Sequence, residues 1–177
     1  MGTGGQVIAI DGKQLRRSHD RGRGKAAIHM VSAWASHNHL TLGQRKGDAK
    51  SNEITAMPQL LEVLMVAGGI VTIEAMGCQK DIAQKIIDKK ADYVLALKEN
   101  QEHLYQDTVA WFSHAHQTNF RGVDSDYARP VEKDHGRLEF RECWTLYDPD
   151  GFPDLRNTAA WANLHPRHGQ ARTSPSE

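Results

Sequence analysis

Two carboxylates each follow a short apolar run in this chain, and such a pair suits divalent-metal chemistry. Residues 7–10 (Val-Ile-Ala-Ile) run into Asp11, and residues 70–73 (Ile-Val-Thr-Ile) run into Glu74. Runs of this length that are rich in β-branched residues predict buried strands. A charge at the end of a buried strand is costly unless it is paired or binds a metal. Side by side, the two strands would bring the carboxylates together at one edge of a sheet, an arrangement suited to phosphoryl transfer.

The segment that follows Asp11 is basic. Its cations are Lys13, Arg16, Arg17, Arg21, Arg23 and Lys25, and Asp20 is the acid among them. A basic stretch beside a carboxylate site can hold a phosphate backbone, whereas a solvated loop is the alternative that charge alone leaves open. The formal net charge of the chain is zero, so no field of the whole molecule attracts nucleic acid.

Composition and cysteine usage exclude several classes of protein. With 177 residues, 39% of them hydrophobic and 25% charged, the chain fits one globular domain with a core of its own. Cys78 and Cys143 form no CxxC pair, which argues against a zinc ribbon or redox motif and favours reduced cytosolic thiols. No apolar stretch is long enough to span a membrane, and residues 1–5 lack the apolar core of a signal peptide. We therefore expect a cytoplasmic protein without a membrane partner.

The hydrophobic period separates two parts of the chain. Three strands are predicted first, and then helices alternate with strands. The predicted strands cover residues 7–11, 27–35, 40–45, 70–75 and 92–98, and the predicted helices cover residues 79–90 and 101–114. A further helix begins at the capping residues Ser51 or Asn52, or at Pro58, and ends at Gly68-Gly69.

The rest of the chain has a weaker pattern. Residues 117–134 are polar and predict a loop, whereas residues 136–146 fit either a strand or a short helix. The last residues carry almost no apolar side chains and predict disorder. We therefore expect a flexible lead-in over residues 1–6, one core over residues 7–147, and a divergent tail over residues 148–177.

The order of three strands followed by helix, strand, helix, strand and helix predicts an α/β fold. It consists of one mixed sheet, antiparallel in its first three strands, with helices on both faces. This order is that of the ribonuclease-H-like fold, in which the first strand neighbours the strand after the first helix. Asp11 and Glu74 would then be adjacent.

Six short segments resemble a known family when they are taken in order. They are residues 9–13 (AIDGK), 31–34 (VSAW), 50–54 (KSNEI), 75–79 (AMGCQ), 92–98 (DYVLALK) and 135–139 (HGRLE). Together they resemble insertion-sequence transposases of the DDE class, and in particular the H-repeat-associated (Rhs-linked) group. The resemblance extends over residues 7–146.

The resemblance implies an enzyme that cleaves and rejoins DNA at transposon ends. In that family three acids hold two Mg²⁺ (or Mn²⁺) ions. Asp11 matches the first acid, Glu74 stands where the family has an Asp, and Glu139 matches the third acid. Alternation alone leaves Glu132 and Glu142 as other candidates for the third acid. Lys13, His135 and Arg137 would contact phosphate. The implied partners are transposon ends, target DNA and further copies of the chain, and the implied location is the nucleoid.

Departures from the family pattern bear on activity. Glu74 is one methylene longer than Asp, and Mg²⁺ demands near-ideal octahedral geometry. The helical region that the family has before the first strand is missing, and the resemblance ends near Leu164. These departures indicate a copy truncated at both ends that is decayed or inactive as a transposase. The alternatives are a catalytically dead DNA-binding or interaction module, or a product that does not fold stably.

Overall fold

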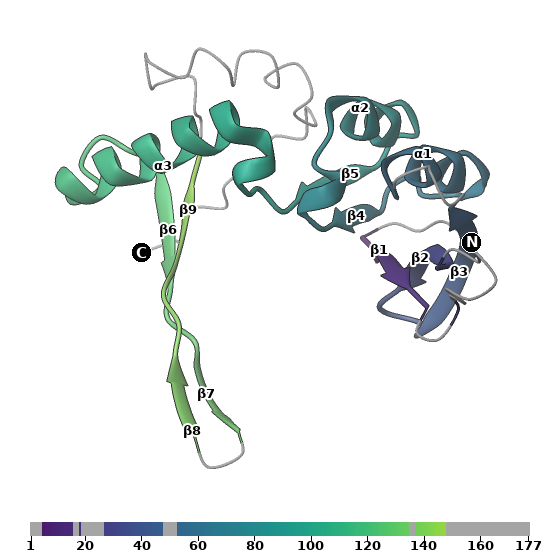
Figure 1. Cartoon of the computed structure of the whole chain (residues 1–177). Helices are drawn as coiled ribbons and strands as arrows, with labels where there is room; N and C mark the ends of the chain where they lie inside the picture. The colour runs from purple at the N-terminus through teal and green to yellow at the C-terminus, as the bar shows by residue number, and fades with distance from the viewer. Residues whose placement is uncertain (1–4, 16–17, 19–26, 48–52, 135–136, 148–177) are drawn as a thin grey trace. The chain divides into compact units, whose positions relative to one another are not determined.

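The computed structural model describes residues 5–15, 18, 27–47, 53–134 and 137–147, which form two compact units (Figure 1). Unit 1 extends to Gln101, and unit 2 begins at Glu102. Residues 148–177, for which a disordered tail was predicted, lie outside the described residues. The prediction that residues 7–147 act as one core stays a prediction.

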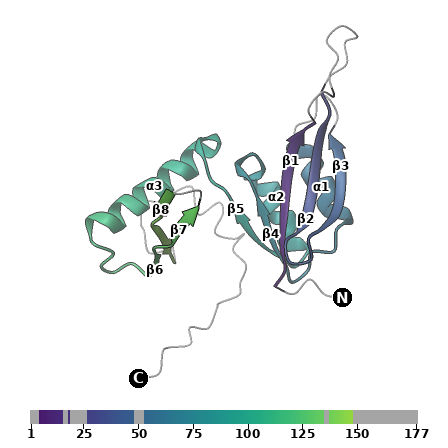
Figure 2. The ribbon, with the colours of Figure 1, turned by 90° about the horizontal axis from the view of Figure 1, so that it is seen from below.

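Unit 1 contains the predicted order of strands and helices. Its elements are β1 (Val7–Gln14), β2 (His29–Ala35), β3 (Leu40–Gly47), α1 (Glu53–Val63), β4 (Ile70–Ile73), the 3₁₀ turn η2 (Ala75–Gly77), α2 (Lys80–Asp88), β5 (Asp92–Leu95) and the 3₁₀ turn η3 (Glu99–Gln101). The strands form one mixed sheet in the order β3-β2-β1-β4-β5 (Figure 2). β1 pairs antiparallel with β2 and parallel with β4, so the first strand in the chain lies at the centre of the sheet.

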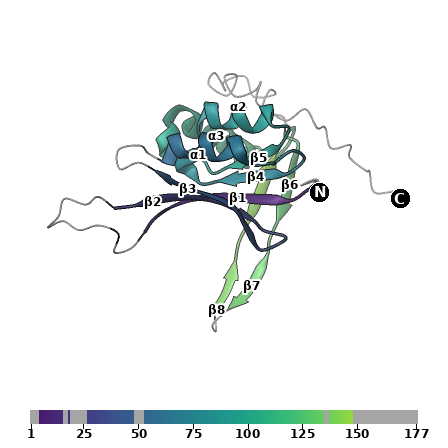
Figure 3. The same cartoon turned by 90° about the vertical axis from the view of Figure 1, so that its right-hand side faces the viewer.

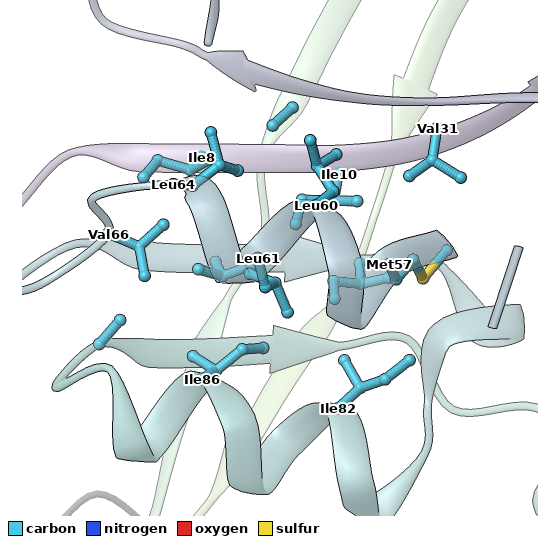
Figure 4. Packing of buried hydrophobic residues seen from close by; sticks show 14 of the residues in the cluster. Ile8, Ile10, Val31, Met57, Leu60, Leu61, Leu64, Val66, Ile82 and Ile86 are labelled. Carbon is cyan, nitrogen blue, oxygen red and sulfur yellow. The ribbon is translucent and has the colours of Figure 1, made fainter. Parts of the chain in front are cut away.

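Both helices of unit 1 cover the same face of this sheet (Figures 3 and 4). Successive residues of a strand point to opposite faces, so alternate residues of β1 point into the core. Ile8 is fully buried and Ile10 is 2% exposed. The core side chains labelled in Figure 4 are Ile8, Ile10, Val31, Met57, Leu60, Leu61, Leu64, Val66, Ile82 and Ile86. The α/β class and the mixed sheet agree with the prediction, and helices on both faces stay a prediction.

Helix α1 begins at Glu53, as expected from a cap at Asn52, but ends earlier than predicted. It includes Pro58, which rules out the alternative that the helix begins at Pro58. Proline lacks the N–H that would bond to the carbonyl of Ile54. Burial of Met57 and Leu61, both on this helix, offsets that loss. The helix ends at Val63 rather than at the glycines, because Leu64 and Val66 reach the core from a non-helical segment.

The segment before β1 is tied to the sheet at its last two residues. The N–H of Gly5 donates to the carbonyl of Gly68 at 2.7 Å. The carbonyl of Gln6 accepts from the N–H of Ile70 at 2.9 Å. Gly5 and Gln6 of the predicted lead-in are thus hydrogen-bonded, and its other residues, 1–4, lie outside the described residues.

Unit 2 is a helix with a two-stranded ribbon (Figure 1). Its elements are α3 (Glu102–Gln117), β6 (Ser125–Ala128), β7 (Val131–Asp134), β8 (Arg137–Phe140) and β9 (Cys143–Leu146). β6 pairs antiparallel with β9, and β7 pairs antiparallel with β8. The prediction of a loop over residues 117–134 was wrong, since β6 and β7 lie there. Residues 136–146 hold two strands instead of one strand or a helix.

An aromatic cluster connects α3 to the ribbon. The ring of Trp144 on β9 lies 4.8 Å from His116 on α3 and 5.0 Å from Tyr127 on β6, measured between ring centroids. It also stacks on Phe120, at 6.0 Å and an interplanar angle of 4°. Tilted and offset ring pairs of this kind stabilise beyond simple area burial. Trp144 is therefore the centre of packing in unit 2.

Within the part of the chain that the structure describes, none of the helices has the length and apolar character needed to cross a membrane.

Candidate carboxylate site

The parallel pairing of β1 with β4 places Asp11 beside Glu74. The register pairs Ile8 with Val71 and ends at Ile10 with Ile73. Asp11 and Glu74 each follow that last pair by one residue. The backbone of Glu74 is still extended, with φ −68° and ψ 170°. Asp11, inside β1, and Glu74, directly after β4, therefore occupy neighbouring positions on two parallel strands, as the sequence predicted, although β1 continues to Gln14 instead of ending at Asp11.

Both carboxylates belong to the sheet face that α1 and α2 leave uncovered. Ile10 and Ile73 are 2% and 4% exposed beneath the helices. Successive residues of a strand point to opposite faces, so the next residue on each strand faces away from the core. Asp11 and Glu74 are accordingly exposed. The pair offers oxygen donors on an open face, which are the ligands that Mg²⁺ and Mn²⁺ prefer.

A tight turn follows Glu74 and is packed against α1. The carbonyl of Glu74 accepts from the N–H of Gly77 at 2.9 Å. A Cβ at Gly77 would lie 2.3 Å from Cγ2 of Ile73 and 2.8 Å from Sδ of Met57. Only glycine fits this position without displacement of the core. Core packing therefore fixes the path of the chain immediately after the second carboxylate.

Cys78 lies in the same segment and is 3% exposed. Burial raises the pKa of the Cys78 thiol, which keeps it protonated at neutral pH. A protonated, buried thiol is a poor nucleophile. Cys78 is thus a packing residue in the segment that follows Glu74.

The third predicted acid belongs to the other unit. Glu139 is on β8, where its backbone pairs with that of Glu132 on β7. The side chains of both residues lie outside the described part of the chain. The remaining candidate, Glu142, accepts a hydrogen bond from the hydroxyl of Tyr127 at 3.0 Å. The structure leaves Glu139 as a prediction.

The predicted metal cluster is also not assembled among the described residues. In that part of the chain, no group of three or more His, Cys, Asp or Glu side chains could hold a metal ion. Asp11 and Glu74 alone make a pair of donors. A third protein ligand would have to come from outside the described side chains or from a partner.

Among the predicted phosphate-binding residues, Lys13 is the one whose side chain is described. It is exposed on β1, two residues after Asp11, and therefore on the same face of the sheet. The side chain of Arg137, on β8, is not described, and the other members of the set lie outside the described residues. These others are Arg16, Arg17, Arg21, Arg23, Lys25 and His135.

Sequence reasoning missed two amides that contact this region. Asn100 donates to the carbonyl of Ala75 at 2.8 Å, and Gln101 donates to the carbonyl of Cys78 at 2.8 Å. Both bonds run to backbone atoms about two dozen residues away, which side-chain periodicity does not reveal. Their place directly after the β5 segment was the available signal.

Comparisons with known proteins identify the family of this chain. A family model described as "Transposase DDE domain" matches residues 2–155. The chain is 52% identical over 139 residues to "Putative transposase YncI" of Escherichia coli (strain K12), covering 78% of this chain and 55% of YncI. It is 47% identical over 149 residues to "H repeat-associated putative transposase YbfD" of the same strain, covering 84% of this chain and 58% of YbfD.

A third relative is "H repeat-associated putative transposase YhhI", also of Escherichia coli (strain K12). The identity is 44% over 158 residues, which is 89% of this chain and 40% of YhhI. The chain thus spans about half the length of the curated relatives that it matches. Because the family model covers most of the chain, the resemblance drawn from the six segments is confirmed, and the chain belongs to the family of transposases with a DDE domain.

Proposed function

We propose that this chain is the catalytic core of an insertion-sequence transposase, which cleaves and transfers DNA strands at transposon ends. The observation that carries the proposal is the parallel pairing of β1 with β4, which sets Asp11 and Glu74 at neighbouring positions on an open sheet face. Ribonuclease-H-like topology is part of the proposal, and the strand order β3-β2-β1-β4-β5 supports it.

The two carboxylates fit a divalent cation by their chemistry. Both are oxygen donors, both are exposed, and Lys13 lies on the same face, where it could contact a phosphate group. When bound, Mg²⁺ or Mn²⁺ would supply neutralisation of the charge that develops on the reacting phosphate. Asp11 and Glu74 would hold and orient the ion, and we propose Glu139 as the third carboxylate.

The proposed partners and location follow from the same reaction. The substrates are transposon ends and target DNA, contacted through Lys13, Arg137, His135 and the basic residues between positions 16 and 25. Copies of the chain would assemble with one another to hold two DNA ends. The protein would act on the nucleoid in the cytoplasm.

The length of the Glu74 side chain decides between an active transposase core and a catalytically dead DNA-binding module. The extra methylene, compared with Asp, moves the carboxylate on the order of 1 Å, and a misplacement of that size can cost about 100-fold in rate. We therefore propose a copy whose strand-cleavage activity is low or lost. A catalytically dead DNA-binding module is the alternative, and the substitution at position 74 favours it.

Binding of Mn²⁺, measured by water-proton relaxation, tests the site directly. The experiment compares the native chain with Asp11→Ala and Glu74→Asp, and adds DNA nicking for every variant that binds. We expect the native chain to bind, Asp11→Ala to lose binding, and Glu74→Asp to bind more tightly and nick DNA faster. An exposed acid of unit 1 away from the site provides the control, because Asp81→Ala on α2 should leave binding unchanged.

Two outcomes would contradict the proposal. Equal Mn²⁺ binding by the native chain and Asp11→Ala would remove Asp11 from the site. Tight Mn²⁺ binding by Glu74→Asp without any DNA nicking would favour the DNA-binding module. In that case salt-dependent DNA binding is the expected activity, because phosphate contacts release counterions.

A further inference from the structure

We propose that the amides of Asn100 and Gln101 position Glu74 for metal binding by clamping the turn that follows it. This inference rests on the proposed function, since it assigns the residues that hold the second carboxylate in place. Both amides belong to η3, which follows the β5 segment within unit 1. They lie far from Glu74 in the chain and reach it through the backbone of η2.

The clamp consists of three hydrogen bonds from side-chain amides. Nδ2 of Asn100 donates to the carbonyl of Ala75 at 2.8 Å. Nε2 of Gln101 donates to the carbonyl of Cys78 at 2.8 Å and to Oε1 of Gln79 at 3.2 Å. The bonds are partly buried, so water competes with them less than at an exposed surface. They hold the turn at its beginning and at its end.

The carboxylate of Glu74 does not support this turn itself. Glu74 occupies the N-cap of η2, a position where an acid commonly accepts a hydrogen bond from the following backbone. Here its side chain makes no capping hydrogen bond. Backbone hydrogen bonds and the side-chain amides of Asn100 and Gln101 stabilise the turn instead. The Glu74 carboxylate is not used in stabilising the helix end.

The bonded carbonyl of Ala75 is adjacent to Glu74, so the clamp acts one peptide unit from the carboxylate. On the other side, the carbonyl of Ile73 accepts from the N–H of Ala96 at 3.0 Å, which fixes the end of the strand. Glu74 is therefore anchored on both sides by the β5–η3 segment. Groups that orient a metal ligand typically change metal affinity 10- to 100-fold when they are removed.

The test compares Asn100→Leu, which keeps the size of the side chain but removes the donor, with a matched amide variant. Gln84→Leu is the control, because the side-chain amide of Gln84 donates its hydrogen bond to Asp88 on the same helix, α2, and not to the turn. Mn²⁺ affinity is measured by water-proton relaxation, and hydrogen exchange is measured at the amides of Gly77 and Cys78. The thermal midpoint is recorded for each variant.

We expect Asn100→Leu to weaken Mn²⁺ binding at least tenfold and to speed exchange at Gly77 and Cys78, with a thermal midpoint close to that of Gln84→Leu. Gln101→Leu should act in the same direction, and it replaces Asn100→Leu if that variant does not fold. Native Mn²⁺ affinity in both clamp variants would overturn the positioning role, whatever the exchange rates.

Failure of the clamp can be distinguished from failure of the proposed function. If the native chain binds no Mn²⁺, the proposed function fails. Hydrogen exchange alone then tests whether the two amides hold the turn. Unchanged exchange at Gly77 and Cys78 in the clamp variants then overturns the clamp, whereas faster exchange confined to the turn supports it.

Discussion

The two units of this chain are stabilised in different ways. Of the apolar side chains that the structure describes as buried, all belong to unit 1 except Ala115 on α3. Unit 2 relies on rings that contact one another around Trp144 and on the ladder of its ribbon. Several of its large side chains are about half exposed, including Tyr127 at 51% and Phe140 at 56%. Among the side chains that the structure describes, unit 1 therefore has the core that can fix the geometry of a carboxylate site.

The largest effect is expected from the removal of core volume in unit 1. Leu61→Ala on α1 deletes a fully buried side chain, which should cost about 2–5 kcal/mol through lost burial and the remaining cavity. Val109→Ala on α3, at 46% exposure, should change stability by no more than about 0.5 kcal/mol. Urea unfolding followed by far-ultraviolet circular dichroism measures both. Similar costs for the two variants would remove the distinction between the units.

An intermediate effect is expected from the centre of unit 2. Trp144→Leu removes the ring contacts to His116, Phe120 and Tyr127, and each such pair contributes about 0.5–1.5 kcal/mol. The ribbon should open more readily, by about 1.5–4.5 kcal/mol in total if the three contributions add, while the sheet of unit 1 is unaffected.

Hydrogen exchange separates these two results, because the amides of β6 and β9 report on unit 2 and those of β1 and β4 report on unit 1. Trp111→Leu is the matched control, since the described ring contact of Trp111 is with Phe112, 6.2 Å away on the same helix. If exchange in β1 also accelerated in Trp144→Leu, the two units would depend on one another for stability.

The smallest effect is expected from the ion pair between Glu62 on α1 and Lys85 on α2. The hydrogen bond and charge of Lys85 lower the pKa of the Glu62 carboxyl below its ordinary value of 4.5. A lowered acid pKa contributes stability above the unfolded value and loses it as pH falls through the folded value.

The difference in urea midpoint between the native chain and Glu62→Gln should therefore be present at pH 7 and be lost as the pH falls below 4.5 through the lowered pKa of Glu62. Exposure of the Glu62 side chain, at 67%, keeps this difference small and sensitive to salt. A difference that persisted at low pH would show that Glu62 acts through packing rather than through charge.

Burial also explains how much the sequence could predict. The apolar run over residues 7–10 predicted β1, because Ile8 and Ile10 on one face of that strand are covered by the core, and the structure adds that Asp11 is exposed. The described side chains of the ribbon in unit 2 form no covered face of this kind. Its exposed Tyr127, Val131 and Phe140 give no alternation, and β6 and β7 were consequently predicted as loop.

The site was predictable to a similar extent. Asp11 and Glu74 were found because each ends an apolar run, and their adjacency followed from the expected strand order. Asn100 and Gln101 were missed because a hydrogen bond from a side-chain amide to a distant backbone carbonyl leaves no periodic pattern in the sequence. Glu139 stays a prediction, since only its backbone is described.

The central position of β1 has a consequence for how the chain is made. A ribosome delivers β1 first, and β2 and β3 can pair with it soon afterwards as a hairpin-connected sheet. The other edge of β1 must wait for β4, since Val7 pairs with Ile70. During this interval the strand that carries Asp11 has an open edge, and open edges recruit incorrect partners. Synthesis of α1 and β4 thus both completes the carboxylate pair and closes this edge of β1.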